Sequence, residues 1–108
     1  MVKEGRRHRY IGFIINNSDR DITRSEMTKE LQRQCNHIFN KDRNKMGIRL
    51  IRFNGKAGII KCNHTEKKNA IRLLQAIKKI ASKKLGVTTI ATSGTIRSLI
   101  KKHMSIYL

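Results

Sequence analysis

The stretch IRLIRFNGKAGIIKCN, residues 48–63, predicts a β-hairpin on which the rest of the chain is organised. Asn54 and Gly55 lie between two runs rich in β-forming residues. Asn-Gly is a strong hairpin signal because a two-residue type I′ turn needs positive φ at both central positions. The pairs that such a turn predicts are Phe53 with Lys56, Leu50 with Ile59 and Arg49 with Ile60.

Both faces of this hairpin are apolar in the predicted register, since directly opposed residues share a face. One face carries Ile48, Leu50, Ala57 and Ile59; the other carries Ile51, Phe53, Ile60 and Cys62, with Arg49 and Lys56 at its margins. Two apolar faces are typical of strands that are covered on both sides. A different turn type would exchange the faces, so the sequence leaves the register open.

The composition indicates one basic domain with a polyanionic partner. The chain has 108 residues, enough for one modest core, and carries 25 Lys and Arg against 7 Asp and Glu, a net charge of +18. A charge of this size repels itself unless a polyanion neutralises it, so nucleic acid is the expected partner and a membrane surface is the weaker alternative. No run approaches the ~20 apolar residues of a membrane span, and two isolated cysteines are no disulfide scaffold. We therefore expect a reduced, cytoplasmic location.

Strand and helix signals precede the hairpin. Residues 1–9 form a basic arm, and residues 10–16 are too short and too rich in β-formers for a helix, which predicts a buried strand. A first helix begins at Thr23, which has capping-box spacing to Glu26, and it ends near Asn40.

Three further elements follow the hairpin. A second helix has Asn63 or Thr65 as its cap and Gly86 as its stop. A strand at residues 87–92 and a last helix after residues 93–95 complete the chain. The buried stripe of the second helix comprises Ala70, Leu73, Leu74, Ile77, Ile80 and Ala81, and that of the last helix comprises Ile96, Leu99, Ile100, His103 and Met104.

The order strand, helix, hairpin, helix, strand, helix predicts an α+β fold. It is the β-α-β-β-α-β plan of a ferredoxin-like or RRM-like sandwich, with an appended C-terminal helix. The two main helices would cover one face of the sheet, and the last helix would pack on the other. We assign residues 1–9 to the arm and residues 10–108 to a single domain.

Three short segments resemble a known family. RYI at residues 9–11, GIIKC at residues 58–62 and SGTIR at residues 93–97, with the capped first helix, closely resemble the ribonuclease P protein component 2 family. That family is the archaeal relative of a small eukaryotic subunit of ribonucleases P and MRP. The resemblance runs from about residue 7 to residue 103.

The resemblance implies a place in the ribonucleoprotein that removes the 5′ leader of precursor tRNA. It implies that this chain is part of an enzyme only as a subunit, since the RNA carries out the cleavage with Mg²⁺ and the chain itself binds no cofactor. The partners that it implies are the ribonuclease P RNA, protein component 3 in a heterodimer or heterotetramer, other ribonuclease P proteins, and precursor tRNA indirectly. Whether two copies of the chain pair is left open.

Base stacking on the sheet is not the expected mode of RNA binding. An RNA-stacking third strand carries aromatic platforms, whereas KAGIIKC at residues 56–62 is aliphatic, so phosphates and RNA shape should dominate. Residues 93–95 are the most specific candidate for a phosphate-binding site, because free N–H groups at a helix start attract anions. The alternative is an ordinary N-cap with a flexible glycine. The predicted RNA-binding residues are Arg6, Arg7, Arg9, Lys41, Arg43, Lys45, Lys56, Ser93, Gly94, Thr95, Arg97 and Lys101.

Neither a metal site nor a protein-based nuclease is predicted. The acidic residues are too few and too scattered to hold Mg²⁺, and Cys35 and Cys62 lie on apolar stripes, where core positions are expected. A free-standing or ribosome-associated basic RNA-binding protein is the alternative function, because the charge fits it equally well.

Overall fold

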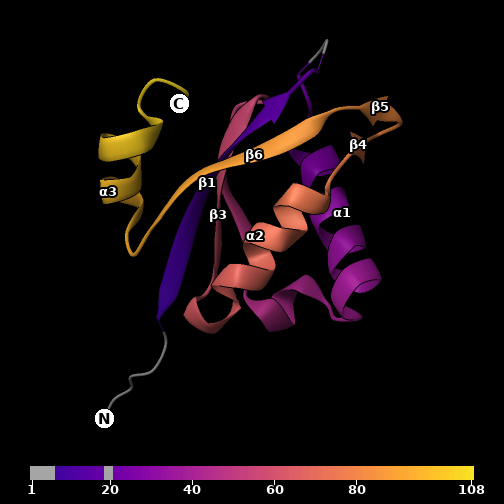
Figure 1. Cartoon of the computed structure of the whole chain (residues 1–108), viewed down its shortest axis with the longest axis horizontal. Helices are drawn as coiled ribbons and strands as arrows, with labels where there is room; N and C mark the ends of the chain where they lie inside the picture. The colour runs from indigo at the N-terminus through magenta and orange to yellow at the C-terminus, as the bar shows by residue number, and fades with distance from the viewer. Residues whose placement is uncertain (1–6, 19–20) are drawn as a thin grey trace.

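The computed structural model describes residues 7–18 and 21–108, and Figure 1 shows their arrangement. One antiparallel sheet has the strand order β2-β3-β1-β6. Its strands are β1 (His8–Asn16), β2 (Arg49–Phe53), β3 (Ala57–Asn63) and β6 (Gly86–Ser93). Helices α1 (Arg24–Gln34) and α2 (Lys67–Ala76) lie on one side of the sheet and α3 (Ile96–Leu99) on the other (Figure 1). The predicted ferredoxin-like sandwich with an appended helix is confirmed.

Strand β1 begins earlier than the sequence predicted. It starts at His8, so His8 and Arg9, assigned to the arm, belong to the sheet. The carbonyl of Arg7 accepts a hydrogen bond from the N–H of His64 at 3.0 Å, which fixes the entry to the strand. The rest of the predicted arm, residues 1–6, lies outside the described residues.

Helix α1 has the predicted capping box. Thr23 Oγ1 accepts from the N–H of Glu26 at 3.1 Å, and Glu26 Oε1 accepts from the N–H of Thr23 at 2.9 Å. These two bonds satisfy backbone donors that a helix start leaves free. The helix continues into a π-helical turn, Cys35–Phe39, and ends at Asn40, whose φ of 54° is left-handed. Both predicted ends of this helix are confirmed.

The hairpin is confirmed, but its register differs from the predicted one. The N–H of Asn54 donates to the carbonyl of Ala57 at 3.0 Å, and Asn54 Oδ1 accepts from the N–H groups of Lys56 and Ala57 at 3.0 and 2.8 Å. This side chain closes a turn longer than a type I′ turn, and Gly55 supplies positive φ, at 97°. The observed pairs are Phe53 with Gly58, Leu50 with Ile60 and Arg49 with Lys61, with an irregularity between Leu50 and Arg52.

Two hydrophobic cores fill the two sides of the sheet. The larger core lies under α1 and α2 and includes Ile11, Phe13, Leu50, Ile60 and Cys62. The smaller core packs Ala57 and Ile59 of β3 against Leu99 and Met104. The last helix therefore covers the second face, which explains why β3 is apolar on both sides, as predicted. The predicted grouping of Leu50 with Ile59 is wrong, because the observed register turns Leu50 toward α1 and α2.

The second helix is much shorter than predicted. It ends at Ala76, and β4 (Lys79–Ile80) and β5 (Lys83–Lys84) form a small hairpin in place of its last turns. Ala81 and Ser82 have φ of 51° and 70°, as a tight hairpin turn requires. Gly86 is the first residue of β6 and is not the helix stop that was predicted. The prediction failed because Ile77 and Ile80 are buried in either conformation, so their helical spacing does not distinguish a helix from this hairpin.

The last helix has the predicted buried stripe with one exception. Leu99 and Met104 are fully buried, and Ile96 and Ile100 pack against them, but His103 is exposed. The segment Ile100–Met104 is a π-helical turn, which brings residues five apart, such as Leu99 and Met104, to one face. Within the described part of the chain, no helix has the length and apolar character needed to cross a bilayer.

Candidate nucleic-acid interface

Residues 93–95, the strongest phosphate candidate in the sequence, connect β6 to α3. Thr95 is the N-cap of α3, and its Oγ1 accepts from the N–H of Ser98 at 3.2 Å. The N–H of Thr95 donates to Ser93 Oγ at 3.3 Å. Both hydroxyl oxygens therefore accept backbone hydrogen bonds within the turn, as the ordinary N-cap interpretation predicted.

The fold brings further cations to this turn. Arg9 Nη1 lies 3.6 Å from the position that a Cβ on Gly94 would take, and it donates to the carbonyl of His8 at 3.2 Å. Arg97 is exposed on α3, and Lys101 is exposed one turn further along. Positive charge from β1 and α3 is thus gathered around the backbone of residues 93–95.

Gly94 does not use the positive φ that glycine tolerates. Its φ lies outside the left-handed region, in which the described glycines are Gly47 and Gly55. A Cβ on Gly94 would meet Arg9 Nη1 at 3.6 Å, an ordinary van der Waals contact. The fold itself therefore does not require glycine here.

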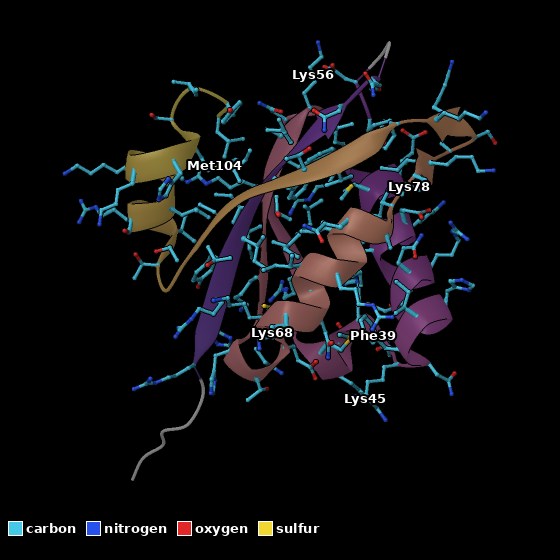
Figure 2. All side chains as sticks on the ribbon, in the orientation of Figure 1. Phe39, Lys45, Lys56, Lys68, Lys78 and Met104 are labelled. Carbon is cyan, nitrogen blue, oxygen red and sulfur yellow. The ribbon has the colours of Figure 1, made fainter. Side chains whose placement is uncertain are left out.

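The predicted loop cations divide into one structural residue and two exposed ones. Arg43 Nη1 donates to the carbonyl of Ile48 at 3.1 Å, which holds the 3₁₀ turn Arg43–Met46 against the start of β2. Lys41 is half-exposed, with Nζ 3.9 Å from Glu66 Oε2. Lys45 is exposed and lies with Lys68 at the same end of the molecule (Figure 2). Arg43 therefore positions the loop, and Lys41 and Lys45 present its charge.

Most of the predicted residues that the structure describes lie at one end of the sheet, where β1 and β2 begin and β3 and β6 end. The register pairs His8 with Asn63, Arg49 with Lys61 and Tyr10 with Ser93. We call this the basic end. Its predicted members are Arg7, Arg9, Lys41, Lys45, Ser93, Gly94, Thr95 and Arg97. Arg6 lies outside the described residues.

Lys56 does not belong to the basic end. It sits in the turn between β2 and β3, and Figure 2 shows it at the opposite end of the molecule from Lys45. Its Nζ lies 3.8 Å from Asp21 Oδ1, and both side chains are largely exposed. The structure therefore separates Lys56 from the other predicted residues, since the hairpin carries its turn to the far end of the sheet.

Sequence reasoning missed Arg49 and Lys61. The predicted register placed Arg49 beside Ile60 on the face of the larger core, whereas the observed register sets it opposite Lys61. Because Ile59 belongs to the smaller core, Lys61 two residues later faces the α3 side, and Arg49 faces that side with it. The alternation of apolar residues along β3 was the signal that could have found Lys61.

Cys35 and Cys62 are buried core residues, as predicted. Burial raises the pKa of each thiol to about 11, so neither is a reactive thiolate at neutral pH. Among residues 7–18 and 21–108, no three His, Cys, Asp or Glu side chains lie close enough together to hold a metal ion. The charged groups that the described surface gathers are cations, and these suit binding to a polyanion.

Known proteins are similar to this chain in sequence or in fold. The model of the Rpp14/Pop5 family matches residues 9–104. Ribonuclease P protein component 2 of Methanosarcina mazei is 27% identical over 97 residues, covering 89% of this chain and 83% of that protein. The Methanosarcina barkeri protein of the same name is also 27% identical over 97 residues, covering 89% and 71%.

A chain in the cryo-EM structure of yeast ribonuclease MRP has the same fold, with a TM-score of 0.67 and 16% identity. The match covers 87% of this chain and 79% of that one. Since the family model spans all but the two ends of the chain, this protein belongs to the Rpp14/Pop5 family, in agreement with the resemblance seen in its sequence.

Proposed function

We propose that this chain is a protein subunit of ribonuclease P that binds and braces the catalytic RNA and leaves the chemistry to that RNA. Family membership and the two relatives named component 2 support the assignment to ribonuclease P. The observation that carries the RNA-binding role is the basic end, where exposed Arg7, Lys45 and Arg97 come from three separate parts of the chain. A ribonucleoprotein subunit needs such a surface because phosphates supply most of the affinity for RNA.

The described carboxylates neutralise only part of this surface. Glu30 accepts two hydrogen bonds from Arg33, at 3.0 and 2.9 Å, and one from Gln34, at 2.8 Å. Glu66 lies 3.9 Å from Lys41, and exposed Asp42 follows Lys41 in the loop, so these two acids offset part of the charge. Asp21 lies near Lys56 at the far end. Most cations of the basic end therefore remain available for phosphates.

The rest of the ribonuclease P particle supplies the catalytic metal ion and the other protein subunits. Mg²⁺ binds at the active site of the RNA, and the chain meets precursor tRNA only indirectly, during removal of the 5′ leader. Protein component 3 is its direct protein partner, in a heterodimer or heterotetramer, beside other ribonuclease P proteins. The assembled particle works in the cytoplasm.

RNA binding is tested by titrating the protein with the ribonuclease P RNA of its source organism over a series of salt concentrations. About six engaged cations would give a slope of log affinity against log salt near −4 to −5. A slope shallower than about −2 would mean that the charge faces solvent or a protein. Tighter binding to a ribosomal RNA fragment of equal length would favour a ribosome-associated protein.

The division of labour is tested by reconstitution. The RNA with the other protein subunits should cleave precursor tRNA more efficiently when this chain is added. The chain with Mg²⁺ and precursor tRNA, without the RNA subunit, should produce no 5′ cleavage. Accurate cleavage by the protein alone that Asp21→Ala abolishes would contradict the proposal.

A further inference from the structure

We infer that RNA phosphates bind along a row of side chains that crosses the α3 side of the sheet at the basic end. The row consists of Arg49 on β2, Lys61 on β3, Tyr10 on β1 and Ser93 on β6, and we call it the cross-strand row. This inference rests on the proposed function and names the surface that carries it.

The register places these four side chains side by side on one face. Arg49 is opposite Lys61, Lys61 is opposite Tyr10, and Tyr10 is opposite Ser93. Directly opposed residues share a face, and Tyr10 packs in the smaller core below α3. Three steps of about 4.8 Å between neighbouring strands give the row a length of about 14 Å.

The two cations of the row repel each other in the free protein. Like charges directly opposite in an antiparallel pair are destabilising, and Arg49 faces Lys61 in this way. Within residues 7–18 and 21–108, neither side chain has a hydrogen bond or an ion pair to offset the repulsion. Arg52, opposite Ile59, adds a third cation to the same face. A phosphate chain removes this repulsion by neutralising adjacent cations.

The cross-strand row also joins the two groups of residues that the sequence predicted separately. At one end Ser93 leads into Gly94, beside Arg9. At the other end Arg49 follows the loop that carries exposed Lys45. A strand of RNA following the row would thus pass from the cations of the loop and of Arg49 and Lys61, across uncharged Tyr10 and Ser93, to Arg9 and Arg97 at the start of α3. This continuity favours an extended phosphate backbone over a single anion.

The row is accessible although the centre of the same face is covered. Arg49 is exposed, and Lys61, Tyr10 and Ser93 are partly exposed. Helix α3 and the segment after it cover Ala57 and Ile59, which lie nearer the turn between β2 and β3. The smaller core therefore reaches the row only at Tyr10, and Arg49 and Lys61 lie beside it with their side chains at least partly exposed.

The test is Lys61→Gln, with Lys29→Gln as a matched control. Lys29 is an exposed lysine on α1, on the other side of the sheet, so both variants lose one charge. Affinity for the ribonuclease P RNA should fall about fivefold in Lys61→Gln relative to the control, and the salt slope should become shallower by about 1. Arg49→Gln should behave in the same way.

The thermal stability of the free protein gives a second readout, which should stay the same or rise while the affinity for RNA falls. Because each substitution in the row removes a repulsive pair, Lys61→Gln and Arg49→Gln should unfold at the same temperature as the wild type or at a higher one. A role in folding would lower that temperature, so weaker RNA binding by a more stable protein distinguishes the two explanations.

Three results would overturn the inference. RNA affinity of Lys61→Gln and Arg49→Gln equal to that of Lys29→Gln would leave the proposed function standing and remove the row from it. Loss of binding to component 3 with unchanged RNA affinity would reassign the row to a protein interface. Failure of the wild-type chain to prefer ribonuclease P RNA over a ribosomal fragment would refute the proposed function and the inference together.

Discussion

The sulfur atom of Met104 lies 2.5 Å from the position that a Cβ on Gly12 would take. Gly12 is in the middle of β1, and Met104 ends the helical segment on the second side of the sheet (Figure 2). The absence of a side chain at Gly12 is what allows this segment to approach the strand so closely. The packing of the last helical segment over the smaller core therefore depends on the absence of a side chain at Gly12.

Gly12→Val should loosen this contact. The added side chain must displace Met104, and overpacking of this kind costs roughly 1–3 kcal/mol. Urea unfolding measures the cost, and hydrogen exchange should show faster opening of residues 96–104 than of α1. Gly86→Ala is the control, since nothing lies within 4 Å of a Cβ at Gly86. Equal effects of the two substitutions would contradict the fit between Gly12 and Met104.

Phe13 and Phe53 should differ in their contributions to stability. Their rings stack with centroids 6.1 Å apart, but Phe13 is fully buried, whereas Phe53 is partly exposed. Phe13→Ala should cost roughly 3–5 kcal/mol and Phe53→Ala roughly 1–2 kcal/mol of unfolding free energy. If Phe13→Ala does not fold, Phe13→Leu gives a smaller loss by the same measurement. A folded Phe53→Ala variant that loses RNA affinity would instead show that the sheet stacks bases.

Replacing Ser82, in the turn between β4 and β5, with a residue that tolerates positive φ should increase the stability of the protein. Ser82 has φ of 70°, a conformation that glycine adopts without strain. Ser82→Gly should therefore raise the unfolding free energy by roughly 0.5–1 kcal/mol, because the left-handed strain that is relieved exceeds the extra entropy that glycine loses on folding. Ser25→Gly is the matched control, because Ser25 lies within α1, where glycine is unfavourable by roughly 0.5 kcal/mol. Destabilisation by both substitutions would argue against the hairpin at residues 79–84.

Stability should fall at alkaline pH partly because of the cysteines. Burial raises the pKa of Cys35 and of Cys62 from 9.0 to about 11. Between these values the unfolded chain releases thiol protons that the folded chain keeps, so rising pH favours unfolding. Urea unfolding from pH 8 to pH 11 should show a smaller decline in Cys62→Ala than in the wild type. Rapid alkylation of the folded protein at pH 8 would contradict the raised pKa.

Arg97→Ala should weaken RNA binding or assembly without changing the thermal stability of the free protein. Arg97 is exposed, and the loss expected for a charge-assisted contact is roughly 1–3 kcal/mol. Gly94→Val should also leave the free protein folded, since a Cβ at this position makes only an ordinary contact with Arg9, but it should hinder a close approach of RNA. A defect confined to component 3 binding would assign this turn to a protein interface instead.

Local signals in the sequence were sufficient for the elements whose defining contacts lie within a few residues. Thr23 and Glu26 are three residues apart, and the capping box that they form needs nothing else from the chain. Asn54 and Gly55 likewise placed the hairpin turn. The excess of 25 basic over 7 acidic residues indicated a polyanionic partner before any fold was known. The order of elements then restricted the topology to a split βαβ sandwich.

The tertiary structure decided the hairpin register, the end of α2 and the grouping of the cations. Asn54 Oδ1 closes a longer turn, and a shift in pairing moved Leu50 and Arg49 to the faces opposite those predicted. Packing of Ile80 and Leu85 into the larger core outweighed the helical spacing of residues 70–81. Antiparallel pairing brought Arg9, Arg49 and Ser93 to one end of the sheet, although they are distant in the sequence. Such choices depend on contacts between remote segments, which local propensity does not encode.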